Sequence, residues 1–240
     1  MEKRIRPHTK GFGVFSANRL MIKLIAAMLM LIDHVGAILM PDIYVLRAIG
    51  GLSMPMFAFS LARAFRFAGN GSIFDFKPYF YRLLIFSIVS QLPFHFFMSG
   101  TLNIGFTWLL AFSLLLMITY KHIFNKYLFF VSIAAICAMS VVLRVDYGIY
   151  GVVYPAMFYY CYYKFKKPAS AFLGSILIFA VFVAGISSTI QVIAILAAPL
   201  IQFIEKHDKK IIIPRWFFYV FYPVHITILL LVKYLFFNSN

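Results

Sequence analysis

Long apolar runs constrain this chain more than any other feature of its sequence. Apolar residues make up 63% of the 240 residues and charged residues only 12%, whereas a soluble domain of this size needs a charged surface to face water. A membrane-spanning helix needs about 20 mostly apolar residues, and several runs have that length. We therefore expect an all-α fold, a polytopic integral membrane helical bundle.

Short polar breaks divide the apolar sequence into about nine candidate transmembrane helices. The seventh and eighth are separated only by ISST, so they form a tight helical hairpin or one of them is partly re-entrant, and eight or ten spans are also possible. Because no internal repeat or second domain is evident, we expect a basic cytoplasmic or interfacial tail over residues 1–19 and a single transmembrane domain over 20–240. The candidate spans are 21–40, 46–65, 82–98, 104–120, 127–143, 147–163, 170–186, 189–204 and 216–236.

The basic residues gather on one side of these spans. The chain carries 22 lysine and arginine residues against seven acidic ones. With the N-terminus in the cytoplasm, all but Arg47, Arg144 and Lys233 fall on the cytoplasmic side. This distribution follows the positive-inside rule. We therefore expect a multi-pass protein of the inner (cytoplasmic) membrane with a cytoplasmic N-terminus and an extracytoplasmic C-terminus, and no nucleic-acid partner.

Several common functional signatures are absent from the sequence. There is no P-loop, nucleophile elbow, dinucleotide fingerprint or zinc motif, so we expect no metal site. Cys137 and Cys161 have no redox or metal spacing and are expected to pack as small apolar residues. We also expect no cleavable signal peptide, because the apolar run after the basic tail is long enough to remain as an anchor.

Ionisable side chains within the apolar spans are the main functional signal. Each costs roughly 2.5 kcal/mol or more at membrane depth, and such residues are functional candidates by default. At ~1.5 Å per residue, His34 lies about 20 Å into the first span and His225 about 14 Å into the last. The two histidines can therefore share one depth zone. Both also have a structural interpretation, as residues that hold helices together.

Asp33 and His34 are adjacent, and adjacent side chains on a helix point about 100° apart. We therefore expect each to find a partner on another helix. The candidate partners are Arg47, Arg82 and Asp146.

Other polar residues allow two interpretations each. Asp146 begins the segment DYGIYGVVYP, where it either caps the following helix or positions a catalytic imidazole. Asn103 and Thr107 lie on one helical face, where they either cap a helix or line the mouth of the fourth span. Arg82 either extends towards lipid phosphate or binds an anionic ligand.

Six segments, taken together, resemble the TraX family, named for a conjugative-pilus protein that acetylates the N-terminus of pilin. They are LIAAMLMLIDHVGAILMP, LRAIGGLSMPMFAFSLA, YRLLIFSIVSQLPF, LNIGFTW, DYGIYGVVYP and FYVFYPVHI. The resemblance runs in order from about residue 20 to residue 230. The family motifs fall on Asp33, His34, Arg47, Gly50, Pro55, Asp146, Tyr147, Gly148, Tyr222, Pro223 and His225. One departure is Arg63, in LARAF, where many relatives carry an acidic residue.

The resemblance implies an integral-membrane acyltransferase that uses acetyl-CoA as its donor. It implies that His34 is the general base or carries the acyl group, with Asp33 as its support and Asp146 and His225 as further catalytic candidates. An imidazole has an ordinary pKa near 6.5, which suits it to deprotonate an acceptor. CoA is a cytoplasmic polyanion, so basic residues at that edge are expected to bind it. The expected donor-binding residues are Arg82, Arg47, Lys23, Lys77, Arg66, Tyr222 and Asn103.

Two other function classes remain open at this stage. Intramembrane aspartate and histidine also form proton relays in transporters, although transporters often contain internal repeats. A non-catalytic envelope scaffold is the other alternative. The expected partners of the enzyme are membrane lipid and an acyl acceptor, either a protein N-terminus or a glycan. The sequence leaves the acceptor and the choice of N- or O-acylation open.

Overall fold

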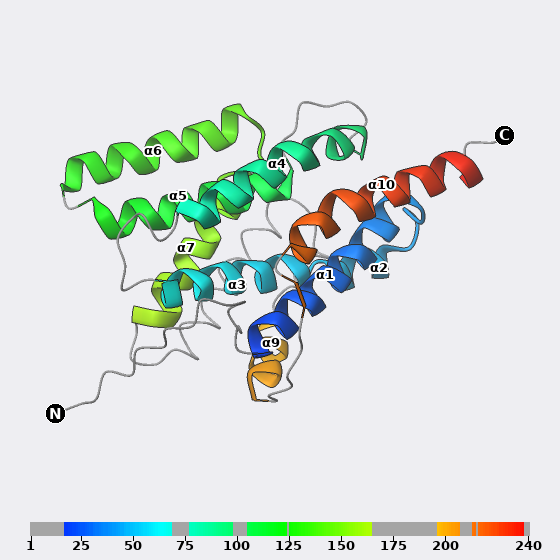
Figure 1. Ribbon diagram of the computed structural model, residues 1–240, viewed down its shortest axis with the longest axis horizontal. Helices are drawn as coiled ribbons and strands as arrows, with labels where there is room; N and C mark the ends of the chain where they lie inside the picture. The colour runs from blue at the N-terminus through cyan, green and yellow to red at the C-terminus, as the bar shows by residue number, and fades with distance from the viewer. Residues whose placement is uncertain are drawn as a thin grey trace.

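The computed structural model describes residues 17–68, 77–97, 105–123, 125–164, 196–206, 213–214 and 216–237. Within these residues every secondary-structure element is a helix, as the sequence predicts. The helices are α1 (Ala17–Ile38), α2 (Tyr44–Gly50), α3 (Ser53–Ala68), α4 (Lys77–Phe97), α5 (Phe106–His122), α6 (Lys126–Val142), α7 (Gly148–Lys164), α9 (Ala197–Lys206) and α10 (Phe217–Phe237) (Figure 1).

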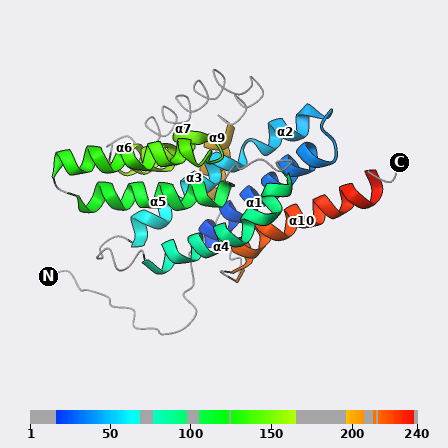
Figure 2. The same cartoon turned by 90° about the horizontal axis from the view of Figure 1, so that it is seen from above.

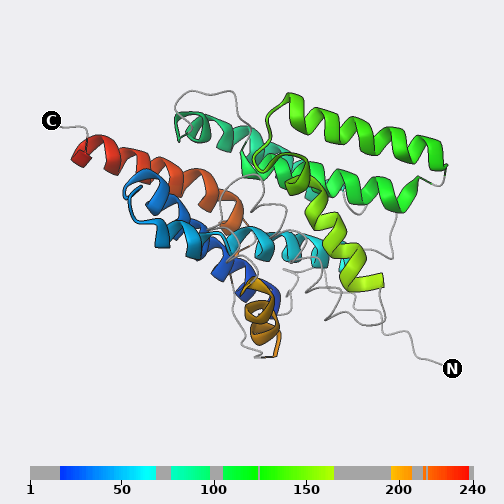
Figure 3. The same cartoon turned by 180° about the vertical axis from the view of Figure 1, so that it is seen from behind.

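Two groups of helices lie at opposite ends of the molecule and are connected by α3 and α4. Helices α1, α2 and α10 form one group, and α5, α6 and α7 form the other (Figure 1). Helix α3 packs against both α1 and α7, while α4 packs against both α5 and α10. The views from above and from behind show the same neighbours (Figures 2 and 3). The first and last helices of the chain are thus in contact.

Among the described residues, four helical stretches are long and apolar enough to cross a membrane. They are Leu20–Ile38, Tyr44–Phe65, Pro78–Phe97 and Phe217–Phe236. Leu110–Thr119 and Lys126–Val142 are shorter apolar helices. The predicted span 170–186 lies outside the described residues, and the span 189–204 is described only where it overlaps α9. The structure therefore supports a helical membrane protein, while the number of nine spans stays a prediction.

The second span, expected over 46–65, corresponds to Tyr44–Phe65, but it consists of two helices. Helix α2 ends at Gly50 and α3 begins at Ser53. Pro55 explains the break, because it has no backbone N–H to bond the carbonyl of Gly51. Proline is tolerated in the first turn of a helix, where that N–H has no intrahelical partner. The chain therefore restarts as a new helix just before Pro55.

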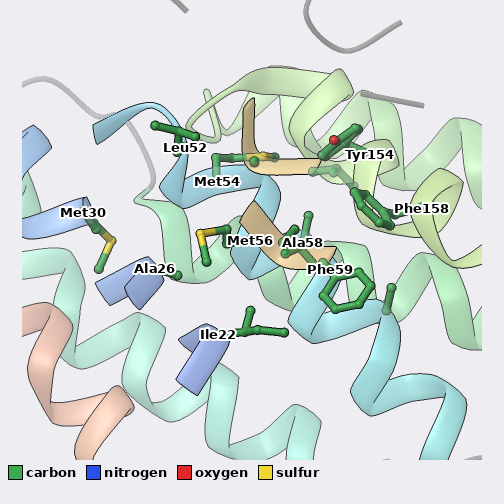
Figure 4. Close-up of a cluster of buried hydrophobic side chains, with 14 of the residues drawn as sticks. Ile22, Ala26, Met30, Leu52, Met54, Met56, Ala58, Phe59, Tyr154 and Phe158 are labelled. Carbon is green, nitrogen blue, oxygen red and sulfur yellow. The ribbon is translucent and has the colours of Figure 1, made fainter. Parts of the chain in front are cut away.

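Side chains from α1, α3 and α7 form the centre of the core (Figure 4). Ile22, Ala26 and Met30 recur every four residues, so they share one face of α1. Phe59 of α3 packs edge-to-face on Phe158 of α7, with ring centroids 5.6 Å apart. In a bilayer such contacts stabilise the bundle mainly through close packing. This packing fixes α1, which carries Asp33 and His34, against α3.

Candidate functional site

Two buried histidines from the first and last helices are in direct contact. Nδ1 of His34 on α1 lies 2.7 Å from Nε2 of His225 on α10. The two rings are within 5° of parallel, and the residues are only 8% and 5% exposed. The sequence predicted a shared depth zone. The structure adds that the two side chains form a pair.

Aromatic rings surround this histidine pair. Phe97, at the end of α4, lies with its ring centroid 5.3 Å from that of His34. Tyr222 presents its edge to both histidines, at 6.3 Å from His34 and 5.7 Å from His225. Phe221 stacks on His225 at 4.6 Å. Such an apolar enclosure strengthens the hydrogen bond between the two imidazoles.

Asp33 has a different partner, as its position next to His34 predicts. Nη1 of Arg47 donates to Oδ2 of Asp33 at 2.5 Å. The pair is possible because α2 approaches the backbone of α1. A Cβ atom on Gly50 would lie 2.3 Å from Cβ of Asp33, and one on Gly36 would lie 2.8 Å from Cβ of Leu46. Glycine at these two positions is therefore what brings Arg47 to Asp33.

Asp146 lies beside this ion pair, in the connection between α6 and α7. Its Oδ1 accepts a hydrogen bond from the backbone N–H of Tyr147 at 3.1 Å. The connection turns sharply, with φ of 49° at Arg144 and 61° at Tyr147. The pKa of Asp146 is raised to about 7. Removal from water is the largest cause and the charge of Asp33 adds to it, whereas the Tyr147 N–H and the charge of Arg47 oppose the rise. Asp146 is thus both a backbone acceptor and an electrostatic neighbour of Asp33 and Arg47.

A cavity of about 240 Å³ is lined by residues of α1, α3, α4, α5 and α10. Its lining is largely apolar but includes the basic residues Lys23, Arg63 and Arg82. Tyr222 lines the same cavity and also contacts both histidines. Tyr222 therefore connects the cavity to the histidine pair.

An ion pair that was not predicted from the sequence lies at this cavity. Nη1 of Arg63 on α3 donates to Oε1 of Glu205 on α9. The scarcity of acidic residues could have pointed to this ion pair, because Glu205 is one of only seven acidic residues in the chain. Each acidic side chain next to an apolar run needs a partner, and Arg63 departs from the expected family pattern.

Comparison with known proteins identifies the family. The sequence matches the TraX protein family over residues 18–233. This chain belongs to the TraX family. The TraX chain is also 31% identical over 245 residues to a probable fimbrial assembly protein, FimC of serogroup H1, from Dichelobacter nodosus. That alignment covers 90% of this chain and 94% of the relative. No solved structure matches the chain.

The remaining predicted site residues of this TraX protein fall into separate places. Lys23, Arg82 and Tyr222 line the cavity, whereas Arg47 pairs with Asp33. Arg66 lies in the last turn of α3 and Lys77 begins α4, and the side chains of both are outside the described part of the structure. Asn103 also lies outside the described residues.

Proposed function

We propose that this TraX protein is a membrane-embedded acyltransferase that transfers an acetyl group from acetyl-CoA to an amine or hydroxyl. The acceptor would be associated with the cell envelope, either a pilin N-terminus or a cell-surface glycan. The proposal rests on family membership and on one observation of the site. A largely apolar cavity with Lys23 and Arg82 in its lining reaches Tyr222, which contacts the buried pair of His34 and His225.

The dimensions of α1 favour this arrangement of donor and histidine. Lys23 and His34 lie on the same helix, 11 residues apart, which corresponds to about 16 Å. The long pantetheine arm of CoA suits such a separation between its phosphates and its thioester. Lys23 and Arg82 supply positive charge for the phosphates, whereas Arg63 is already paired with Glu205. Charged hydrogen bonds to phosphate are among the stronger ones in proteins.

His34 can promote the transfer by either of two routes. As a general base, its imidazole takes the proton of the acceptor while the acceptor nitrogen or oxygen attacks the thioester carbonyl. The C–S bond then breaks, and the imidazole returns the proton to the CoA sulfur. As an acyl carrier, the imidazole itself attacks the carbonyl, the C–S bond breaks, and CoA leaves as the thiolate while the ring becomes an acetylimidazolium. The acceptor then attacks this acetyl group, the bond to the ring breaks, and the acceptor's proton passes through the freed ring nitrogen to the CoA sulfur.

Calorimetric titration of acetyl-CoA into the detergent-purified protein tests the donor. We expect saturable binding that Arg82→Ala weakens by about tenfold, corresponding to the loss of about 1.4 kcal/mol. Lys126→Ala is the matched control, because Lys126 is an exposed basic residue at the start of α6. This control should bind like the wild type. Absence of binding to well-folded wild-type protein would overturn acetyl-CoA as the donor.

His34→Ala separates catalysis from the other function classes. We expect this variant to bind acetyl-CoA normally but to release CoA thiol, in the presence of a peptide with a free α-amine or of a glycan, at least about 10²-fold more slowly. A scaffold would keep its assembly function in the variant. A transporter would show ion-coupled flux without any need for CoA. Either of those results would contradict the proposal.

A further inference from the structure

The hydrogen bonds of His225 determine which of its nitrogens carries a proton. Nδ1 of His225 lies 2.6 Å from the backbone oxygen of Phe221, one turn earlier on α10. A carbonyl oxygen only accepts hydrogen bonds, so Nδ1 of His225 must be the donor. A neutral imidazole has a single N–H. Nε2 of His225 is therefore an acceptor.

This acceptor determines the protonation of His34 in turn. Nδ1 of His34 lies 2.7 Å from Nε2 of His225, so Nδ1 of His34 must carry the hydrogen that it donates. In the neutral ring, Nε2 of His34 then keeps its lone pair. The chain of hydrogen bonds runs from His34 through His225 to the carbonyl of Phe221.

We propose that His225 is a positioning residue that holds His34 in the tautomer with its proton on Nδ1, which makes Nε2 of His34 the reacting atom. The role in catalysis rests on the proposed acyl transfer, whereas the tautomer does not. His225 takes the place that a carboxylate often has beside a catalytic histidine. Asp33, the support expected from the sequence, is hydrogen-bonded to Arg47 instead.

The arrangement suits both protonation states of His34. When Nε2 takes a proton or an acetyl group, Nδ1 still carries its hydrogen and still donates to His225. No side chain has to rotate as charge develops on the ring. A partner that is already in place when charge forms is the general basis of electrostatic catalysis.

The tautomer can be measured directly by ¹⁵N NMR of the purified protein labelled at histidine, because protonated and unprotonated ring nitrogens have very different shifts. We expect His34 to be protonated at Nδ1 and not at Nε2. In His225→Asn, whose shorter side chain leaves Nδ1 of His34 without its acceptor, we expect the proton to move to Nε2. In His225→Gln, which carries an amide oxygen near the former Nε2, we expect Nδ1 to stay protonated.

His95→Asn is the matched control, since His95 lies on α4, where its ring contacts Phe96. It should leave the signals of His34 unchanged. A wild-type protein with the proton on Nε2 of His34, or a His225→Asn variant with the wild-type signals, would overturn the inference. The His225→Gln spectrum keeps the test valid if His225→Asn fails to fold.

Kinetics then test the role of this tautomer in acyl transfer. We expect His225→Asn to lower kcat by about 10²–10⁴-fold, with partial recovery in His225→Gln. The KM for acetyl-CoA should stay unchanged, because the donor cavity is lined by other residues. If the NMR result is as expected but the wild type transfers no acetyl group, the proposed function fails and the tautomer assignment stands. Unchanged kcat in His225→Asn would overturn the positioning role.

Discussion

At the scale of single residues, Arg47 interacts with two carboxylates that come from distant parts of the chain. It donates a short hydrogen bond to Asp33, and its charge also acts on Asp146. One positive charge cannot balance two negative ones. Removal from water, and to a smaller extent the charge of Asp33, raise the pKa of Asp146 to about 7. The folded protein therefore holds a proton on this carboxyl that the unfolded chain would release.

This raised pKa predicts how Asp146 affects stability as pH changes. The pKa in the folded protein, about 7, exceeds the ordinary value of 3.8. The stabilisation by the bound proton is therefore complete below the ordinary pKa and is lost as pH rises through about 7. Asparagine cannot ionise, so Asp146→Asn should lack this decline. Its Tm relative to wild type should be higher at about pH 8 than at about pH 5.

Thermal unfolding in detergent at the two pH values measures this difference. Asp42→Asn, at an exposed aspartate in the turn before α2, is the matched control and should not change the trend. Parallel pH curves for wild type and Asp146→Asn would contradict the prediction.

The residue-level predictions succeeded where they depended on local geometry. The angle between adjacent helical side chains predicted that Asp33 and His34 have different partners, and Arg47 was among the candidates. The contact between His34 and His225 was beyond reach, because it depends on α1 packing against α10, 191 residues away. Helical spacing fixes the depth of a residue but not its neighbour on another helix.

At the scale of elements, glycines set the distance between α1 and α2. Gly36 of α1 and Gly50 of α2 lie at close approaches of the two helices, and a methyl group at either would overlap atoms of the other helix. Small residues have this role in many membrane helix pairs. The close approach is also what places the side chain of Arg47 next to Asp33.

Gly50→Ala should therefore destabilise the protein. The added Cβ would lie 2.5 Å from Cα of Asp33, and backbone atoms cannot relieve an overlap by changing rotamer. We expect a loss of at least about 2 kcal/mol, together with separation of Asp33 from Arg47. Gly51→Ala is a matched control one residue away, because its Cβ would lie 3.4 Å from the nearest atom, the carbonyl oxygen of Ala48. Unfolding titrations measure both variants, and equal stabilities would contradict the prediction.

The sequence predicted the helices better than their interruptions. The expected spans 21–40, 127–143 and 216–236 agree closely with α1, α6 and α10, because apolar length directly determines a membrane helix. The break between α2 and α3 was missed, since hydropathy stays high through residues 50–55 and Pro55 acts through the backbone. The cavity was not predictable, because it depends on the packing of five helices.

At the scale of the whole molecule, the cavity brings together basic residues from three helices. The sequence analysis places all three of these residues on the cytoplasmic side of the membrane. Lys23 lies in the first part of α1, Arg82 in the first part of α4, and Arg63 in the second half of α3. Since α3 runs opposite to the other two, this convergence agrees with the alternating directions predicted from the basic residues. The membrane orientation itself remains a prediction.

Reporter fusions can test this orientation. We expect alkaline phosphatase fused after Asn240 to be active and green fluorescent protein at that site to be dark, because the C-terminus is predicted to be extracytoplasmic. Fusions after Ile123, in the predicted cytoplasmic connection between α5 and α6, should give the opposite pattern and serve as the matched control. The same pattern at both sites would contradict the predicted topology.

The position of Tyr222 between the cavity and the histidine pair has a consequence for what has to move. Under the proposed function, the phosphates of CoA stay at the basic end of the cavity, and only the uncharged pantetheine arm with its acetyl thioester reaches the imidazole. An ion that crosses an apolar barrier loses its hydration, at a cost of many kcal/mol, whereas an uncharged thioester bears little of that cost. The aromatic side chains around the histidine pair can then exclude ions while the uncharged thioester still reaches the imidazole.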